Sequence, residues 1–270
     1  MDRKGTTKSQ GRKHSQDKFY TKPEIAKQCI DFIDDIKDYD VIIEPAAGNG
    51  SFSQQIEGCL AFDINPESSE IIKQDWFEYK QERDVKKILV IGNPPFGVSN
   101  TLALKFINHA ADFADTIAFI LPISFKKYSV QDKIDKNLHK TKEMVLPKNS
   151  FILGDVEYDV PCIFQIWEWK KEERDKRTRK TSSEFFDFVK KEDNPDCRIQ
   201  RVGGNAGKAS IDLDKSSESN YFIRIKNDMS VQEFVDYTNT LVFPGRDYGV
   251  GPRTLSKDEL ITVFEENYPS

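Results

Sequence analysis

Short apolar runs alternate with longer amphipathic segments over much of this chain. Six runs have the length of a β-strand, and most are separated by stretches long enough for a helix. One of these stretches, residues 100–114, repeats Leu104, Ile107 and Ala111 at helical spacing. Alternation of strands and helices predicts a mostly parallel sheet with helices on both faces. The six runs are residues 40–45, 60–64, 86–95, 116–125, 142–147 and 161–169.

The two ends of this region have patterns of their own. Residues 23–36 carry apolar side chains every three or four positions, with Pro23 in the first turn, and predict a helix. The last two apolar runs are joined only by residues 148–160. A connection this short favours a hairpin, which would make the final strand antiparallel.

The pattern changes after residue 170. Residues 170–184 are highly charged and predict a loop, and the segment beyond mixes helical and strand-like stretches. We therefore expect a domain boundary near residue 170. The expected regions are a disordered basic tail (1–17), a first domain (18–170) and a small C-terminal α+β region (171–270).

Three stretches of the C-terminal region predict individual elements. SSEFFDFVKK (182–191) is interpreted as helical, and NYFIRIK (220–226) as a strand. Ser256 precedes KDELITVFEE and is typical of a helix N-cap.

Composition narrows the class of protein. The 270 residues are 37% hydrophobic and 31% charged, which suits a folded protein with one α/β core and a smaller appendage. The apolar runs fall short of the roughly 18 residues that a membrane span needs, so no membrane anchor is expected. The N-terminus lacks the apolar core of a secretory signal, which predicts an intracellular location. The four cysteines show no metal-ligand spacing, so we expect reduced thiols and no metal site.

Charge is unevenly distributed along the chain. The net charge is −5, yet residues 1–27 carry eight basic and three acidic side chains, 8 − 3 = +5. Residues 170–180 carry seven against three, 7 − 3 = +4. Such segments could contact phosphates, or they could be a solvated tail and a solvated loop.

A glycine-containing loop, EPAAGNGSF (44–52), follows the first apolar run. Gly48 and Gly50 allow a sharp turn and a close approach to a ligand. The loop is neither G-x-G-x-x-G nor a phosphate-binding P-loop, which argues against a dinucleotide or a nucleoside triphosphate. The sequence predicts a ligand site at this strand end, although a plain strand-to-helix turn is equally compatible.

Two acidic residues extend this pattern. Asp63 ends the second run, 63 − 44 = 19 residues after Glu44, where a carboxylate can accept hydrogen bonds from ribose hydroxyls. Asp75 comes at the next turn and could accept from an adenine amine, with Trp76 or Phe77 against the ring. Each aspartate alone could be a helix cap or a solvated turn. Together they predict a pocket for an adenosyl group.

The third strand run ends in Asn93-Pro94-Pro95-Phe96. The prolines fix the backbone, so the Asn93 side chain and the Pro94 carbonyl present two acceptors rigidly. Two convergent acceptors suit an amino group such as the exocyclic amine of adenine, and Phe96 offers a face for stacking. The alternative is a proline turn after a core strand.

These motifs together carry a family resemblance. NPPF, preceded by the glycine loop and by DKFYTKPEIA (17–26), resembles the S-adenosylmethionine-dependent adenine-N6 DNA methyltransferases. The order FYTKP, glycine loop, NPPF is similar to the gamma arrangement of that family, with target recognition C-terminal. The resemblance covers about residues 17–169. It implies a Rossmann-like methyltransferase sheet of seven strands with an antiparallel last strand.

The resemblance also implies a cofactor, S-adenosyl-L-methionine, and a set of residues around it. These are Phe19, Tyr20, Thr21 and Pro23 at the methionine end, Glu44, Ala46 and Gly48 in the loop, Asp63 at the ribose, Asp75 with Trp76 or Phe77 at the adenine, and Asn93.

The same resemblance assigns the target site. Asn93 and the Pro94 carbonyl would bind the target amine, Pro95 completes the catalytic motif, and Phe96 would stack on the base. Phe151 fits the second aromatic that many members place on the other face, although it could equally belong to the core.

The predicted function is methyl transfer to N6 of adenine in DNA, with the base flipped out of any duplex. RNA is the alternative substrate, because families similar to cap-specific RNA adenosine methyltransferases also use NPPF. Protein-glutamine methyltransferases use the same motif. A third hypothesis is an inactive, methyltransferase-like subunit that binds nucleic acid. The C-terminal region is small for a sequence-reading domain, which leaves room for a homodimer or a partner subunit. Residues 200–210 and 243–260 are candidate substrate-facing loops.

Overall fold

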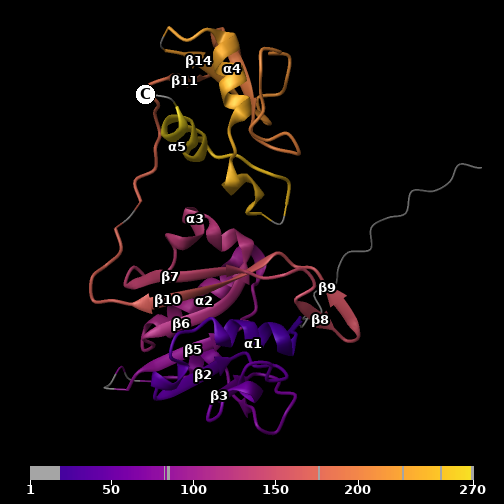
Figure 1. Cartoon of the computed structure of the whole chain (residues 1–270), viewed down its shortest axis with the longest axis vertical. Coiled ribbons are helices and arrows are strands. Elements are labelled where there is room, and N and C mark those ends of the chain that lie inside the picture. Colours follow the sequence, from indigo (N-terminus) through magenta and orange to yellow (C-terminus); the bar gives the residue numbers. More distant parts are fainter. Residues whose placement is uncertain are drawn as a thin grey trace, which may run out of the picture.

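A seven-stranded sheet forms the centre of the N-terminal part, residues 19–169 (Figure 1). The computed structural model describes residues 19–81, 83, 86–175, 177–226, 228–249 and 251–268, so the tail expected at 1–17 lies outside the described residues. In spatial order the strands are β4 (Ile72–Lys73), β3 (Leu60–Asp63), β2 (Val41–Pro45), β5 (Ile88–Gly92), β6 (Thr116–Pro122), β10 (Cys162–Trp169) and β7 (Leu138–Val145).

The strand directions match the predicted fold class. Strands β2 to β6 pair in parallel, and β10 runs antiparallel to both of its neighbours, β6 and β7. The pairing of β10 with β6 is continuous from Cys162 opposite Pro122 to Glu168 opposite Thr116. The chain therefore has a Rossmann-like methyltransferase sheet, in which the last strand is inserted between its two predecessors.

Apolar side chains point to both faces of this sheet. In β5, Ile88 and Val90 belong to one core cluster, whereas Leu89 and Ile91 belong to the other. Helix α2 (Thr101–Ala111) contributes to the first cluster and α1 (Pro23–Asp31) to the second. Central strands are continuously apolar because both of their faces are covered.

Helix α1 is shorter than the sequence pattern predicts. It begins at Pro23, where a missing N–H costs nothing, and ends at Asp31 rather than Ile36. Asp35 has a left-handed backbone (φ +45°), which breaks the helix before a 3₁₀ turn. The remaining helical elements of this part are η1 (Ile36–Asp38), η2 (Ser53–Gln55), η3 (Trp76–Glu78), η4 (Val98–Asn100), η5 (Ile123–Lys126) and α3 (Tyr128–Gln131).

A second, three-stranded sheet lies beside the large one. It joins β1 (Tyr20–Thr21) to the hairpin of β8 (Phe151–Leu153) and β9 (Val156–Tyr158). Thr21 lies opposite Phe151 in this pairing. The connection between the last two strands of the large sheet is thus itself a hairpin, which brings the start of the described chain next to residue 151.

The C-terminal part, residues 177–268, has its own sheet and its own core. Phe186, Ile223, Phe234 and Phe264 pack together in one cluster. The strands in order are β11 (Phe186–Val189), β14 (Asn220–Ile225), β12 (Cys197–Gln200) and β13 (Ala209–Ser210), with α4 (Val231–Thr240), α5 (Lys257–Asn267), η6 (Lys191–Asp193) and η7 (Pro244–Asp247).

One expectation for this part was wrong. SSEFFDFVKK contains β11 and not a helix, because Phe186 is buried while Asp187 is exposed, and the strand pairs with β14. The strand expected at NYFIRIK is confirmed as β14, and Ser256 caps α5 by accepting a hydrogen bond from the Glu259 amide.

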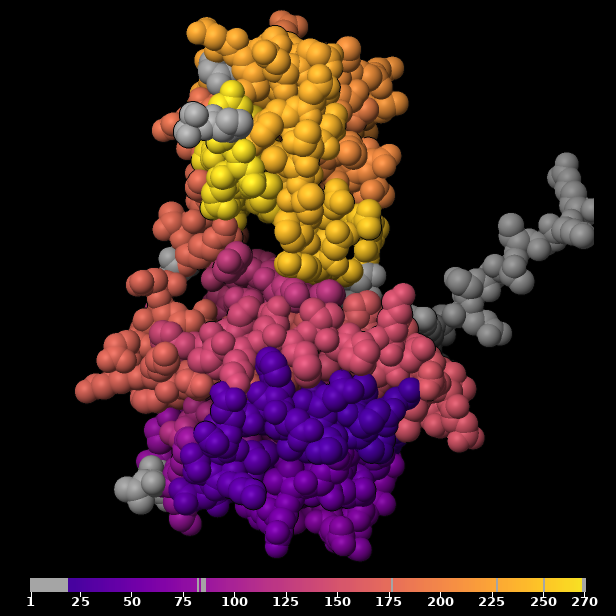
Figure 2. Space-filling model, viewed as in Figure 1, coloured from indigo at the N-terminus to yellow at the C-terminus, as the bar shows by residue number. Residues whose placement is uncertain are grey.

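The two parts touch near η7. The Lys126 ammonium lies 5.4 Å from the ring centre of Tyr248. Arg177, in the connecting segment, pairs with Asp258 of α5 at 3.0 Å and covers the Tyr128 ring at 4.0 Å. Figure 2 shows the C-terminal part resting on the surface formed by the middle of the chain.

Candidate active site

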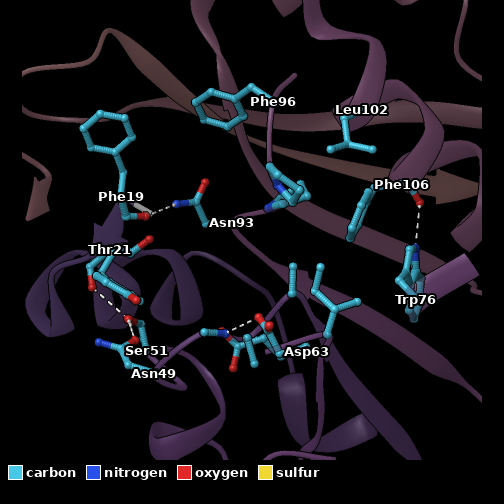
Figure 3. A pocket seen from close by; sticks show the side chains of 18 of the residues that line it. Phe19, Thr21, Asn49, Ser51, Asp63, Trp76, Asn93, Phe96, Leu102 and Phe106 are labelled. Atoms are coloured by element: carbon cyan, nitrogen blue, oxygen red, sulfur yellow. Dashed lines mark hydrogen bonds between the residues drawn. The ribbon is translucent and has the colours of Figure 1, made fainter. Parts of the chain in front are cut away.

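A cavity of about 720 Å³ opens at the carboxyl ends of β2, β3 and β5, with β1 and β8 on its other side (Figure 3). All predicted site residues except Pro23 line it. These are Phe19, Tyr20, Thr21, Glu44, Ala46, Gly48, Asp63, Asp75, Trp76, Phe77, Asn93, Pro94, Pro95, Phe96 and Phe151. Pro23 instead starts α1, and its carbonyl accepts a hydrogen bond from Gln55.

The glycine loop is held by Asp63. The Gly48 amide donates to Asp63 Oδ2 at 2.8 Å, and the Asn65 amide donates to Oδ1 at 2.7 Å. Gly48 has φ +58°, and a Cβ there would lie 3.0 Å from Tyr20 Cε1. Glycine is thus required both by the backbone conformation and by the close approach of β1. Asp63 orients the loop while its carboxylate faces the cavity.

Glu44 lies beneath the same loop. Its side chain is buried, with 2% exposed, and accepts hydrogen bonds from the Ser53 amide at 2.7 Å and the Phe52 amide at 3.3 Å. Burial raises the pKa of Glu44 to about 7, because the charged carboxylate loses its hydration. These contacts tie the end of β2 to the turn that follows the glycine loop.

Asp75 and the two aromatic residues after it form another wall. Asp75 Oδ1 accepts from the Phe77 amide at 2.9 Å and caps η3. Trp76 is 3% exposed, and its ring stacks on Tyr79 (centroids 5.7 Å apart) and Phe106 (6.2 Å). Phe77 is 39% exposed. Trp76 therefore belongs mainly to the core, and Phe77 offers the more accessible ring.

The amide of Asn93 is oriented by Phe19, the residue just before β1. Its Nδ2 donates to the Phe19 carbonyl at 3.4 Å, while its Oδ1 is buried and accepts no hydrogen bond from the described residues. A carbonyl can only accept, so this contact fixes the nitrogen toward Phe19 and leaves the oxygen free. Figure 3 shows that oxygen on the side of Phe96. A buried acceptor without a partner is costly unless a ligand supplies the donor.

The rest of the NPPF motif is fixed to α2. The Phe96 carbonyl accepts from the Leu102 and Ala103 amides at 3.2 and 3.3 Å, and the half-buried Phe96 ring lines the cavity. Phe151 lines it from β8 and is only 1% exposed, since it also packs in the core. The two rings thus reach the cavity from different elements, Phe96 from the loop after β5 and Phe151 from β8.

The sequence from residue 27 to residue 173 matches the model of the EDM2 methyltransferase-like domain, 147 of the 270 residues. The chain belongs to this family. No curated protein matches the chain.

Several solved structures are similar to this EDM2-like chain. The protein 1320 of Thermoplasma acidophilum is 16% identical and aligns over 59% of this chain and 93% of its own, with a TM-score of 0.43. The 23S rRNA methyltransferase ErmE is 10% identical over 56% and 68% of the two chains (TM-score 0.37). Magnesium protoporphyrin IX methyltransferase from Synechocystis, with bound SAM, is 12% identical over 54% and 76% (TM-score 0.36).

Part of the cavity wall was not predicted from the sequence. Leu102 and Phe106 line the cavity from one face of α2, and Val160 lines it just before β10. Leu102 and Phe106 are four positions apart, which places them on one helix face, and this spacing could have indicated both residues from the sequence. No sequence pattern indicates Val160, because its position depends on the β8–β9 hairpin.

Three further features of the structure concern metals, thiols and membranes. Within the described residues, no group of three or more His, Cys, Asp and Glu could hold a metal ion. All four cysteines are free thiols. None of the described helices combines the length and apolarity that crossing a bilayer requires.

The buried Glu44 should make stability depend on pH. Its folded pKa, about 7, lies above the usual 4.5, so its contribution is complete below about pH 4.5 and is lost as the pH rises through 7. Between pH 5 and 8 this loss amounts to roughly 2 to 3 kcal/mol. Glu44→Gln should flatten the decline in the free energy of unfolding, measured with urea. Glu57→Gln, on the surface, should leave the decline unchanged, and an equal decline in all three proteins would contradict the argument.

Proposed function

We propose that this protein transfers a methyl group from S-adenosyl-L-methionine to the N6 amine of adenine in DNA. The observation that carries the proposal is the free, buried Oδ1 of Asn93 beside the Phe96 ring. An acceptor fixed in this way needs a donor, and an exocyclic amine next to a flat ring supplies both the donor and the surface that stacks.

The cavity residues fit the cofactor. Thr21 Oγ1 is, like Asn93 Oδ1, buried without a hydrogen-bond partner in the described part of the chain, and it lines the cavity. Asp63 and Asp75 would accept from the ribose hydroxyls and the adenine amine, and Phe77 would lie against the ring. Phe19, Tyr20 and Thr21 would surround the methionine end. When bound, S-adenosyl-L-methionine supplies an electrophilic methyl group.

The chain's own residues act on the amine. The N6 lone pair is delocalised into the adenine ring, which makes the amine a poor nucleophile. Asn93 Oδ1 and the Pro94 carbonyl accept its two hydrogens, and both bonds strengthen as the nitrogen becomes pyramidal and positive. Stabilisation therefore increases toward the transition state. Phe96 stacks on the base, with Phe151 on the opposite side, and a target in a duplex must first leave the base stack.

The C-terminal part supplies the remaining contacts to nucleic acid in this proposal. Its segment at Tyr248, just after η7, adjoins η5, which follows the end of β6. A second copy or a partner subunit could extend this surface.

The test is nucleoside mass spectrometry. The purified protein is incubated with S-adenosyl-L-methionine and, separately, with unmethylated duplex DNA, single-stranded DNA and RNA. We expect N6-methyladenine in a DNA pool. Methylation of RNA alone would replace the substrate and keep the chemistry, because the 2′-hydroxyl permits discrimination. Cofactor binding without any methylated nucleoside would contradict the proposal and favour a protein substrate, a missing subunit or an inactive binding module.

A further inference from the structure

A glycine loop connects β12 and β13 in the C-terminal part. This tip loop comprises residues 203–207. The segment around η7 holds it from behind. The Gly203 amide donates to the Arg253 carbonyl at 2.9 Å, and Arg246 Nη1 donates to the Ala206 carbonyl at 2.8 Å. Gly207 packs so closely on Phe243 that a Cβ would lie 2.6 Å from its ring. The tip loop is thus fixed and is not a loose connection.

The outer surface of the tip loop is open. Gly204 and Asn205 are exposed, and a Cβ built on Gly204 would meet no atom within 4 Å. Among the described residues, the amides of Gly204 and Asn205 have no acceptor, whereas those of Gly203, Ala206 and Gly207 all do. Two neighbouring backbone donors therefore face solvent from a rigid support. Adjacent backbone N–H groups with this freedom bind anionic oxygens well.

The charges around the tip loop favour an anion. Four basic side chains come from the loop's flanks and from its support, Arg201, Lys208, Arg246 and Arg253. Asp247 pairs with both Arg246 and Arg253, and Glu259 is directed to the Gly245 amide. The balance is 4 − 2 = +2, on a chain whose net charge is −5. Within the described residues, Lys208 forms no ion pair, and its ammonium donates to the Asn239 carbonyl at 3.3 Å.

A series of contacts connects the tip loop to the candidate active site. Gly249, just beyond η7, lies beside the Lys127 ammonium, which is 3.5 Å from a Cβ built there. Lys127 directly follows η5, and Ser124 of η5 accepts a hydrogen bond from Asn100, four residues after Phe96, at 2.7 Å. In Figure 1 the orange loops after β12 lie on the same side of the molecule as β8, which lines the cavity. A single elongated ligand could contact both places.

We infer that the tip loop binds the phosphate backbone of the nucleic acid whose base enters the cavity. The inference rests on the proposed function and adds where the substrate strand is held. The Gly204 and Asn205 amides donate to a phosphate oxygen, and the surrounding basic side chains supply the attraction. Glycine at 204 keeps this surface low enough for the backbone to approach. Such a contact positions the strand and reads no sequence.

A charge series at Gly204 tests the inference with the fold held constant. Gly204→Ala, Gly204→Asp and Gly204→Lys all add a Cβ into open space, and they differ in charge. The full chain is titrated, without S-adenosyl-L-methionine, into fluorescently labelled duplex DNA, single-stranded DNA and RNA of equal length. Relative to Gly204→Ala, we expect Gly204→Asp to weaken binding about tenfold and Gly204→Lys to tighten it about threefold. Both differences should shrink as salt is raised.

The control series is placed at Glu57, an exposed residue that precedes β3. It lies at the amino end of the strand, away from the cavity at the carboxyl end. Glu57→Gln and Glu57→Lys should bind nucleic acid equally. Equal affinities across the Gly204 series for all three nucleic acids would overturn the inference. If the Gly204 variants bind nucleic acid equally and methylation is normal, only the role of the tip loop is refuted. If their affinities differ in the expected order but no N6-methyladenine forms, only the proposed function is refuted.

Discussion

Replacing Asn93 by alanine is expected to lower the rate of methyl transfer by about 10²- to 10³-fold, the usual effect of removing one preorganised hydrogen-bonding group that acts in the transition state. The wild-type Oδ1 is already buried, free and fixed by the Nδ2 contact to the Phe19 carbonyl. Its interaction with the amine therefore needs no reorganisation during the reaction. The loss should appear in kcat, because the acceptor stabilises the pyramidal nitrogen more than the flat ground-state amine.

Cofactor binding separates this prediction from a general disruption of the site. Calorimetric titration with S-adenosyl-L-methionine should give Asn93→Ala an affinity within about threefold of wild type, since Asp63 and Asp75 are unchanged. Asn93→Asp should also be slow, because its carboxylate would face the Phe19 carbonyl. Asn267→Ala, on the exposed end of α5, serves as the control and should turn over normally. Wild-type turnover of Asn93→Ala would remove Asn93 from the proposed mechanism.

Local pattern was enough to predict six of the seven strands of the large sheet, all except the two-residue β4. Its central strands β5 and β6 are apolar over most of their length, and the two-faced burial of β5 is visible in four consecutive aliphatic residues, ILVI (88–91). The glycine loop, the two aspartates and NPPF each follow a strand. Parallel strands present their carboxyl ends at one edge of a sheet, so these motifs were expected to converge, and in the structure they line one cavity.

Elements that depend on distant partners could not be predicted. Strand β1 is only two residues long, and it exists because Tyr20 and Thr21 pair with β8, more than a hundred residues away. The sequence predicts a helix at β11 because Phe185, Phe186 and Phe188 fit both the helical and the strand period over so short a segment. Its pairing with β14 decided the outcome.

The choice between Trp76 and Phe77 as the ring against the cofactor adenine also depended on packing that a sequence does not display. Trp76 is enclosed by Tyr79, Phe106 and Phe113, whereas Phe77 keeps an exposed face at the cavity. We therefore expect Trp76→Ala to lower the free energy of unfolding by about 3 to 5 kcal/mol, the cost of removing a large core aromatic residue. Phe77→Ala should cost much less stability.

Cofactor affinity should show the opposite order. Loss of a stacking ring weakens binding of a base by about 1 to 3 kcal/mol, so Phe77→Ala should bind S-adenosyl-L-methionine roughly tenfold more weakly. Both variants are compared by urea unfolding and by calorimetric titration at a temperature where Trp76→Ala remains folded. Ile72→Ala, an exposed apolar residue of β4 outside the cavity lining, is the control and should match wild type in affinity. If Trp76→Ala instead kept its stability and lost affinity, the adenine would lie against Trp76, and the aromatic cluster would be part of the binding site rather than its support.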